Sequence, residues 1–248
     1  GPVGSSAPLT SLTVSGSSQS NAAAIVTAGG QAYAGPLTLG RDATFTGSTV
    51  SFDGSLDGPF AFTIEGAAVF DGAAGSGSPL ASLRLPGSSV FGGGMVSTTG
   101  TQTYAGSATL GGATMLKGTT VTWGANVDGP FALTVDGAVA FGGAVGGVAP
   151  LAALTVNGPI TLNAGAITTQ GNQTYNGAVS LSSDSTLNAS AVRFFGTVDG
   201  PFVLTLQSDG VFGGVVGGVQ PLAGLNLAGT VSLDEARVTT TGGQTYAG

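Results

Sequence analysis

The chain has 248 residues, with 12 acidic and five basic side chains, a net charge of −7, and neither cysteine nor histidine. This composition excludes disulfide frameworks, metal sites built on cysteine or histidine, and catalysis that depends on histidine. Five scattered basic residues in an acidic chain also argue against nucleic acid or an anionic membrane as a partner.

The 46 glycines and 11 prolines approach the level of disordered chains, but 42% of the residues are hydrophobic and only 7% are charged. Disorder requires the opposite balance, so we expect a folded chain with a substantial apolar core. No apolar stretch is long enough to cross a bilayer, and we expect no membrane insertion of this segment.

The first element, "GPVGSSAPLTSLTV" from Gly1, matches "GAVGGVAPLAALTV" from Gly143, and further motifs return with a fixed period of 71, as from Gln31 to Gln102. The repeated positions are Gln31, Gln102, Gln173 and Gln244; Tyr33, Tyr104, Tyr175 and Tyr246; Asp57, Asp128 and Asp199; and Pro8, Pro79, Pro150 and Pro221. Surface loops tolerate insertions, so a spacing without insertions indicates units that stack in strict register. This pattern predicts one continuous solenoid.

We therefore divide the chain into a partial repeat at 1–30, full repeats at 31–101, 102–172 and 173–243, and the start of another at 244–248. Solenoids need polar capping repeats for solubility, and neither end of this chain has that character. We expect the chain to be a segment of a longer protein.

Within a repeat, the phrases "PLTL", "PFAFTI" and "PLASLRL" begin at Pro36, Pro59 and Pro79, and the position equivalent to Pro36 in the next repeat is Ser107. Short runs of Val, Thr, Leu, Ile and Phe broken by glycine predict strands joined by turns. We interpret each step between these positions as one coil of a parallel β-helix, with three coils per repeat. A count of four shorter coils stays open, because the longest step, from Pro79 to Ser107, has room for another turn.

Alternate residues of each strand should point into the core. The residues expected to do so are Leu133, Val135, Val139, Phe141, Leu154 and Val156. Trp123 occupies the position of Phe52 and Phe194 in the other repeats, so it should also be a core residue. Glycine and the Asn–Gly and Asp–Gly pairs should form the corners.

The three Asp-Gly-Pro aspartates, Asp57, Asp128 and Asp199, are the best candidates for a repeated calcium site. Calcium takes six to eight oxygen ligands, and no second acidic position recurs beside them. A turn in which the carboxylate accepts backbone N–H bonds is therefore favoured, and we expect neither a metal nor another cofactor.

The four repeated tyrosines have two interpretations. They form either an exposed aromatic platform for glycans or rings packed over a corner or over a glycine of the next coil, and packing is favoured. Thr98-Thr99 and Thr168-Thr169 occur once per repeat, too rarely for an ice-binding array.

Catalysis is not expected. Asp234-Glu235 is the only adjacent acidic pair, and consecutive strand residues point to opposite faces, which does not suit paired carboxylates. The pair also does not recur as acids in the other repeats. We expect that the chain is not an enzyme.

The phrases "GNQTYNGAVSL", "GTVDGPFVLTL", "FGGAVGGVAPLAALTV" and "AITTQG" resemble the tandem β-strand repeats of very large bacterial surface proteins of the filamentous haemagglutinin-like adhesin type. The resemblance covers the whole chain and implies a right-handed β-helical rod that is secreted to the cell surface or the extracellular space. It implies a role in adhesion, in a surface filament or in a biofilm matrix. The implied partners are further repeats of the same protein, self-association into fibres, and host or matrix glycans.

Overall fold

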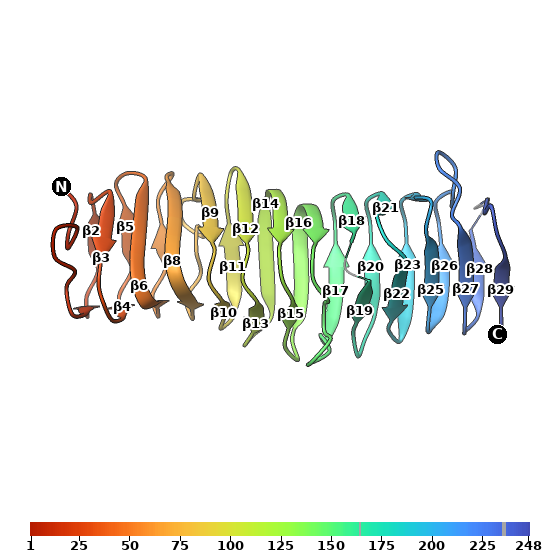
Figure 1. Cartoon of the computed structure of the whole chain (residues 1–248), viewed down its shortest axis with the longest axis horizontal. Helices are drawn as coiled ribbons and strands as arrows, with labels where there is room; N and C mark the ends of the chain where they lie inside the picture. The colour runs from red at the N-terminus through yellow and green to blue at the C-terminus, as the bar shows by residue number, and fades with distance from the viewer. Residues whose placement is uncertain (164, 235–236) are drawn as a thin grey trace. The chain divides into compact units, whose positions relative to one another are not determined.

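The computed structural model describes residues 1–163, 165–234 and 237–248. They form two compact units, unit 1 (Gly1–Gly124) and unit 2 (Ala125–Gly248). Within each unit, short strands lie side by side along the chain (Figure 1) and pair in parallel. The described residues contain strands and no helix. The predicted all-β parallel solenoid is therefore confirmed, and the two units together contain about 12 turns.

The strands of unit 1 are β1 (Leu12–Val14), β2 (Ser18–Ser20), β3 (Ala24–Val26), β4 (Gln31–Tyr33), β5 (Leu37–Leu39), β6 (Ala43–Phe52), β7 (Leu56–Asp57), β8 (Ala61–Phe70), β9 (Ser82–Leu85), β10 (Ser89–Phe91), β11 (Gly94–Ser97), β12 (Thr101–Tyr104), β13 (Ala108–Leu110) and β14 (Thr114–Trp123).

The strands of unit 2 are β15 (Val127–Asp128), β16 (Ala132–Phe141), β17 (Ala153–Val156), β18 (Ile160–Leu162), β19 (Ala166–Thr168), β20 (Gln173–Tyr175), β21 (Val179–Leu181), β22 (Ser185–Asn188), β23 (Ala191–Phe194), β24 (Val198–Asp199), β25 (Val203–Leu206), β26 (Asp209–Phe212), β27 (Gly224–Leu227), β28 (Val231–Leu233) and β29 (Gln244–Tyr246).

Three columns of paired residues run through unit 1 and define its faces A, B and C. Face A contains Leu12, Gln31, Val50, Ala68, Ser89 and Ala108; face B contains Ser18, Leu37, Leu56, Ala74, Val96 and Leu116; face C contains Ala43, Phe62, Leu83, Gln102 and Val121. The chain passes through A, B and C in rotation. One turn therefore has three strand segments, and its length varies modestly, as the steps from Val50 to Ala68 and from Ala74 to Val96 show.

The expected count of three coils per repeat is too low, and the open alternative of four is too high. Between Gln31 and Gln102 the chain makes eleven steps from face to face, at positions 31, 37, 43, 50, 56, 62, 68, 74, 83, 89, 96 and 102. Three steps complete a turn, so one repeat makes 3⅔ turns. The phrases that begin with proline mark only some of the strand segments, because short strands such as β4 and β11 lie between them.

The predicted alternation of buried and outward residues is confirmed. Six predicted core side chains, Leu133, Val135, Val139, Phe141, Leu154 and Val156, are at most 3% exposed, and Trp123 is 1% exposed. Burying a large apolar side chain contributes about 1.5–3 kcal/mol to folding, so the core is the main source of stability.

Aromatic rings stack along face A of unit 1. The ring centroids of Tyr33 and Phe52 are 5.2 Å apart, those of Phe52 and Phe70 are 5.3 Å apart, and those of Phe70 and Phe91 are 5.9 Å apart. The rings are within 15° of parallel in each pair. Such pairs add about 0.5–1.5 kcal/mol beyond the burial of their area, which holds successive turns in register.

Glycine allows a strand to continue around a corner. Gly66 lies in the middle of the ten-residue strand β8 with φ of +142°, and a Cβ there would overlap the carbonyl oxygen of Gly47 on the preceding turn. Gly137 has the same role in β16, with φ of +150°. The equivalent residue of the next repeat is Ser208, where the strand is divided into β25 and β26.

A second set of glycines forms a ladder in unit 2. A Cβ on Gly158, Gly177, Gly196 or Gly214 would overlap the carbonyl oxygen of the glycine one turn earlier, beginning with Gly137. Backbone therefore packs directly on backbone at this corner, where no side chain fits. This ladder includes the glycine that ends the repeated Gln-x-Tyr-x-Gly phrase.

Candidate functional site

The most regular side-chain arrangement is a buried network in the phrase Thr-x-Gly-x-Gln-x-Tyr. Gln102 Nε2 donates hydrogen bonds to the carbonyl oxygens of Val96 (3.1 Å) and Lys117 (2.8 Å) and to Thr98 Oγ1 (3.3 Å). Tyr104 Oη donates to Gln102 Oε1 at 2.7 Å. One glutamine thus joins its own turn to the following turn and accepts a hydrogen bond from a buried phenol hydroxyl.

The network recurs in the other repeats. Equivalent bonds connect Gln31 with Ile25, Thr46 and Tyr33, and Gln173 with Ile167, Asn188 and Tyr175. The threonine hydroxyl donates to a glycine carbonyl two residues later in all four copies, at 2.7–2.9 Å. Buried polar groups need partners, and this set of residues supplies them within the solenoid.

The three complete networks exclude water from their tyrosines. Tyr33, Tyr104 and Tyr175 are between 0% and 2% exposed. Burial raises the pKa of all three hydroxyls far above the ordinary value of 10.0, because the phenolate would lose its hydration.

The hydroxyls of these buried tyrosines should ionise at a higher pH than those of exposed tyrosines. Above about pH 10 the unfolded chain loses tyrosine protons that the folded chain keeps, so folding stability is complete below that pH and falls as the pH rises, by about 1.4 kcal/mol per pH unit for each tyrosine. We expect the tyrosinate absorbance of these residues to appear together with loss of the β-sheet circular dichroism. Tyr104→Phe should show a smaller absorbance step, and gradual ionisation with an intact dichroism signal would contradict the burial.

The favoured packing is confirmed for Tyr33, Tyr104 and Tyr175, and two observations count against the alternative of a repeated glycan platform. Three of the rings are buried, and Tyr33 and Tyr104 lie on different faces of unit 1, because 3⅔ turns move the motif by one face. In unit 2, Gln173 and Gln244 likewise lie in different columns, paired with Leu154 and Leu225. Tyr246 is 39% exposed, and its hydroxyl donates to Gln244.

Each buried tyrosine instead packs on an aromatic ring of the following turn. Tyr104 stacks on Trp123 with a centroid distance of 4.2 Å, and Tyr175 stacks on Phe194 at 5.2 Å. The sequence predicted packing over a corner or a glycine. The difference arises because the residue that pairs with each of these tyrosines on the following turn is also inward-facing and aromatic.

The Asp-Gly-Pro aspartates join neighbouring turns. Asp128 Oδ1 accepts hydrogen bonds from the backbone N–H groups of Val148 (2.8 Å) and Ala149 (3.1 Å). Asp57 accepts from Gly77 and Ser78, and Asp199 from Val219 and Gln220, in the same way. The donors lie one turn further along the chain, whereas the sequence suggested bonds within the local turn. Each carboxylate therefore fixes a projecting loop of the next turn.

The repeated prolines end these projecting loops. Each of them precedes a leucine whose backbone forms a bridge to a threonine of the next turn. The bridges are Leu9 to Thr27, Leu80 to Thr98, Leu151 to Thr169, and Leu222 to Thr240, following Pro8, Pro79, Pro150 and Pro221. The threonine that each bridge reaches belongs to the Thr-x-Gly-x-Gln-x-Tyr motif, whose glutamine is buried in the first three copies and exposed in the fourth.

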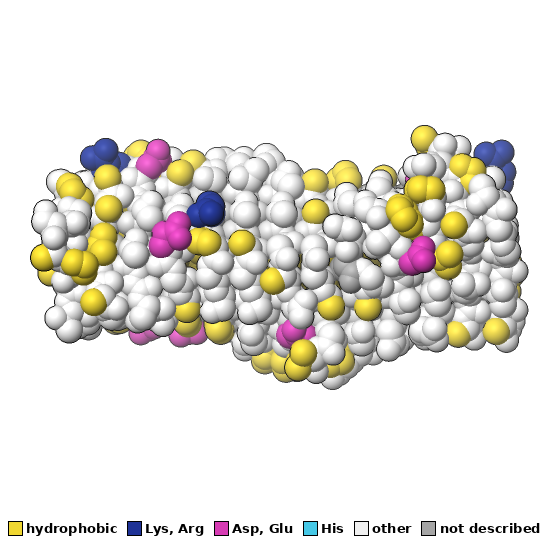
Figure 2. Space-filling view, viewed as in Figure 1, with side chains coloured by type: hydrophobic (Ala, Val, Ile, Leu, Met, Phe, Trp, Pro, Cys, Tyr) yellow, Lys and Arg dark blue, Asp and Glu magenta, His cyan; other side chains and the backbone are white. Residues whose placement is uncertain are grey.

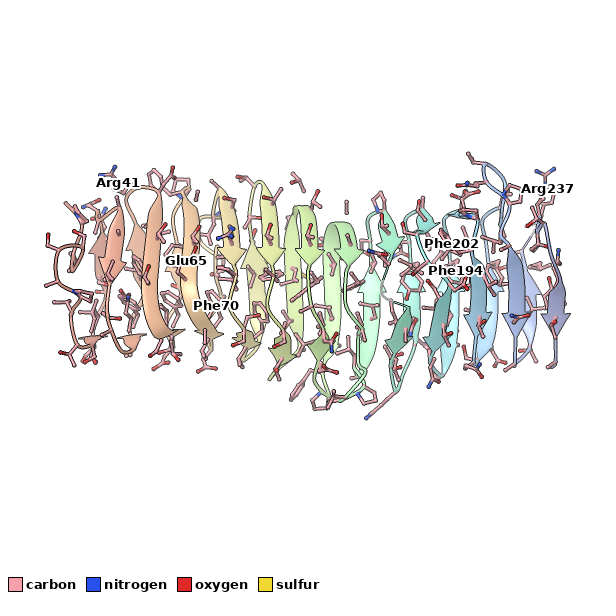
Figure 3. The ribbon with its side chains drawn as sticks, in the orientation of Figure 1. Arg41, Glu65, Phe70, Phe194, Phe202 and Arg237 are labelled. Atoms are coloured by element: carbon pink, nitrogen blue, oxygen red, sulfur yellow. The ribbon has the colours of Figure 1, made fainter. Side chains whose placement is uncertain are left out.

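Charged side chains are sparse and scattered on the face seen in Figure 2. Arg84 and Glu65 form an exposed ion pair at 3.1 Å, a type that contributes about 0–1 kcal/mol. Arg41 in unit 1 and Arg237 in unit 2 project from the edges of their ribbons (Figure 3). Asp234 accepts a hydrogen bond from Ser232, and Glu235 lies outside the described residues.

Within the three described ranges, no group of three or more acidic, histidine or cysteine side chains could hold a metal ion. The same residues contain no helix that is long and apolar enough to span a membrane. Comparison with protein-family models, curated proteins and solved structures finds no match. The repeated residues of the described chain are thus positioned to satisfy buried polar groups and to fasten one turn to the next.

Proposed function

We propose that this chain is a rigid structural segment of a large extracellular bacterial adhesin or surface filament, and that its function is mechanical. The observation that carries the proposal is the use of the repeated residues. The repeated Gln, Tyr and Asp side chains bond to their own turn or to the following turn. A site that binds a ligand in every repeat would instead leave such side chains free at the surface.

The mechanical role follows from how force would be distributed. Parallel backbone ladders on three faces, aromatic stacks in the core and carboxylate bonds between turns all act along the direction in which the turns stack. Pulling along that direction loads many bonds together. Location at the cell surface and a role in adhesion or in a biofilm matrix rest on the resemblance of the repeats to adhesin repeats.

Electron microscopy of the purified chain, combined with immunogold labelling of intact cells that produce the parent protein, tests this proposal. We expect narrow particles of constant width and a diffraction spacing of about 4.8 Å along their length, the distance between paired strands. We expect gold particles outside unbroken cells. Compact round particles, or labelling that appears only after cell lysis, would overturn the proposal.

A further inference from the structure

One corner of unit 2 carries four outward side chains that differ in character from the rest of the repeat. Asp136, Asn157, Asn176 and Phe195 each follow a buried residue of the column that contains Tyr175, so they lie in line on four successive turns. We call these four residues the polar strip. Neighbouring strands are about 4.8 Å apart, and the strip therefore repeats at that spacing.

Hydrogen bonds set the orientation of the strip's amides. Asn176 Nδ2 donates to Asn157 Oδ1 at 2.7 Å, and Asn157 Nδ2 donates to a carboxylate oxygen of Asp136. Both asparagines are exposed, and these bonds use one amide hydrogen of each, so the second amide hydrogen of each and the oxygen of Asn176 are available to a ligand. Groups that are already ordered lose little conformational entropy when a ligand binds.

Phe195 ends the strip with an uncovered ring. Its side chain is 58% exposed, although phenylalanine is among the residues most often buried. The next turn places Gly213 beside it, and glycine has no side chain to cover the ring. An apolar ring thus lies beside a row of hydrogen-bonding groups.

The internal repeat shows that the strip is a local departure from the common pattern. One repeat earlier, the four positions are Glu65, Pro86, Ala105 and Gly124. The inward residues before them stay apolar or aromatic in both repeats: Ile64, Leu85, Tyr104 and Trp123, then Val135, Val156, Tyr175 and Phe194. The core therefore does not explain why these outward positions changed together.

A second outward row runs parallel to the strip. Thr134, Thr155, Thr174 and Arg193 are paired in register on the same strands, two residues before the strip positions. Residues i and i+2 of a strand point to the same side. The surface is therefore two rows wide, with hydroxyls in one row and amides in the other, and its charged groups are one carboxylate and one guanidinium.

We propose that the polar strip of unit 2 binds an extended, uncharged polysaccharide that lies along the strip with about one sugar ring per turn. Asparagine offers donors and an acceptor in one plane, and the aspartate carboxylate offers acceptors, so both can bond to neighbouring sugar hydroxyls. The exposed phenylalanine ring can pack on the apolar C–H face of a pyranose. The turn spacing of about 4.8 Å is close to the length of one pyranose unit in an extended chain.

The two rows together contain one carboxylate and one guanidinium, so they have no excess of positive charge to attract an anionic polysaccharide. An uncharged polysaccharide is therefore favoured as the ligand. The inference goes beyond the proposed mechanical role and does not depend on it, because it concerns one corner of one unit. Loss of the strip should leave the particles seen by electron microscopy unchanged, so the two proposals fail separately.

Affinity electrophoresis in gels that contain hydroxyethyl cellulose, xylan or mixed-linkage β-glucan tests the inference. The unmodified chain should be retarded by at least one of these polysaccharides. Phe195→Ala and Asn176→Ala should each weaken binding at least about tenfold, since each removes a group on which binding depends.

Two matched variants serve as controls. Val219→Ala shortens an apolar side chain that is 90% exposed on a projecting loop, and Asn226→Ala removes an exposed asparagine that pairs with Thr245. Both should bind as the unmodified chain does, and all four variants should keep its melting temperature. Absence of retardation in all three gels would overturn the proposal, as would equal weakening in the controls.

Discussion

Replacing Gly66 by alanine should lower the free energy of unfolding by about 2–6 kcal/mol, the combined effect of a strained backbone and an overpacked contact. Gly66 has φ of +142°, and its added Cβ would overlap the carbonyl oxygen of Gly47. Neither atom can move without separating two hydrogen-bonded turns. Chemical denaturation followed by circular dichroism measures the effect.

Gly16→Ala is the matched control, because a Cβ at that position would meet no atom within 4 Å. We expect its denaturation midpoint to stay close to that of the unmodified chain. At Ser208, the position equivalent to Gly66 that carries a side chain, the strand is divided into β25 and β26. An unchanged midpoint for Gly66→Ala would mean that the close approach of the two turns is not needed.

Replacing Gln102 by leucine should cost about 2–4 kcal/mol of unfolding free energy, because a buried donor left without a partner costs about 1–3 kcal/mol and other bonds are lost with it. The side chain is 0% exposed, and its amide oxygen is the acceptor for Tyr104 Oη at 2.7 Å. Leucine has a similar size but no acceptor. The phenol would then be buried without a hydrogen bond.

A double substitution separates hydrogen bonding from packing. Adding Tyr104→Phe to Gln102→Leu removes the unpaired hydroxyl, and we expect it to restore about 1 kcal/mol or more. Gln244→Leu changes the same motif where the glutamine is exposed, and it should shift stability by less than about 0.5 kcal/mol. If adding Tyr104→Phe lowers stability further, the hydroxyl does not depend on the glutamine.

The fold was predictable because a solenoid repeats the same residue types at fixed spacings along the sequence. The strict return of Gln31 at Gln102 requires stacking in register, and alternation in "ALTV" places Leu133 and Val135 inward. Both conclusions rest on local rules of strand geometry. The number of turns per repeat was not predictable from the phrases that begin with proline, since short strands such as β4 and β11 begin without one and are missed when only those phrases are counted.

The candidate site was less predictable than the fold. The spacing of Tyr33, Tyr104 and Tyr175 was clear, but a tyrosine between small residues fits a surface as well as a core. The available signal was the position one turn later, which holds Phe52, Trp123 and Phe194, because stacked aromatic residues of this kind belong inside. Turn length must be known before that comparison is made.

The sequence by itself determined that this protein is a parallel β-solenoid with an apolar core and few charges, because period, alternation and glycine placement are properties of the chain. Only the tertiary structure decided which residues meet across turns. The structure shows that Asp128 bonds to Val148 and that the repeated motif moves from one face to another between successive repeats. It also shows that Asn157, Asn176 and Phe195 lie in line. The physical reason is that such contacts depend on turn length, which is set by the three-sided stacking of strands and not by the period of the repeat.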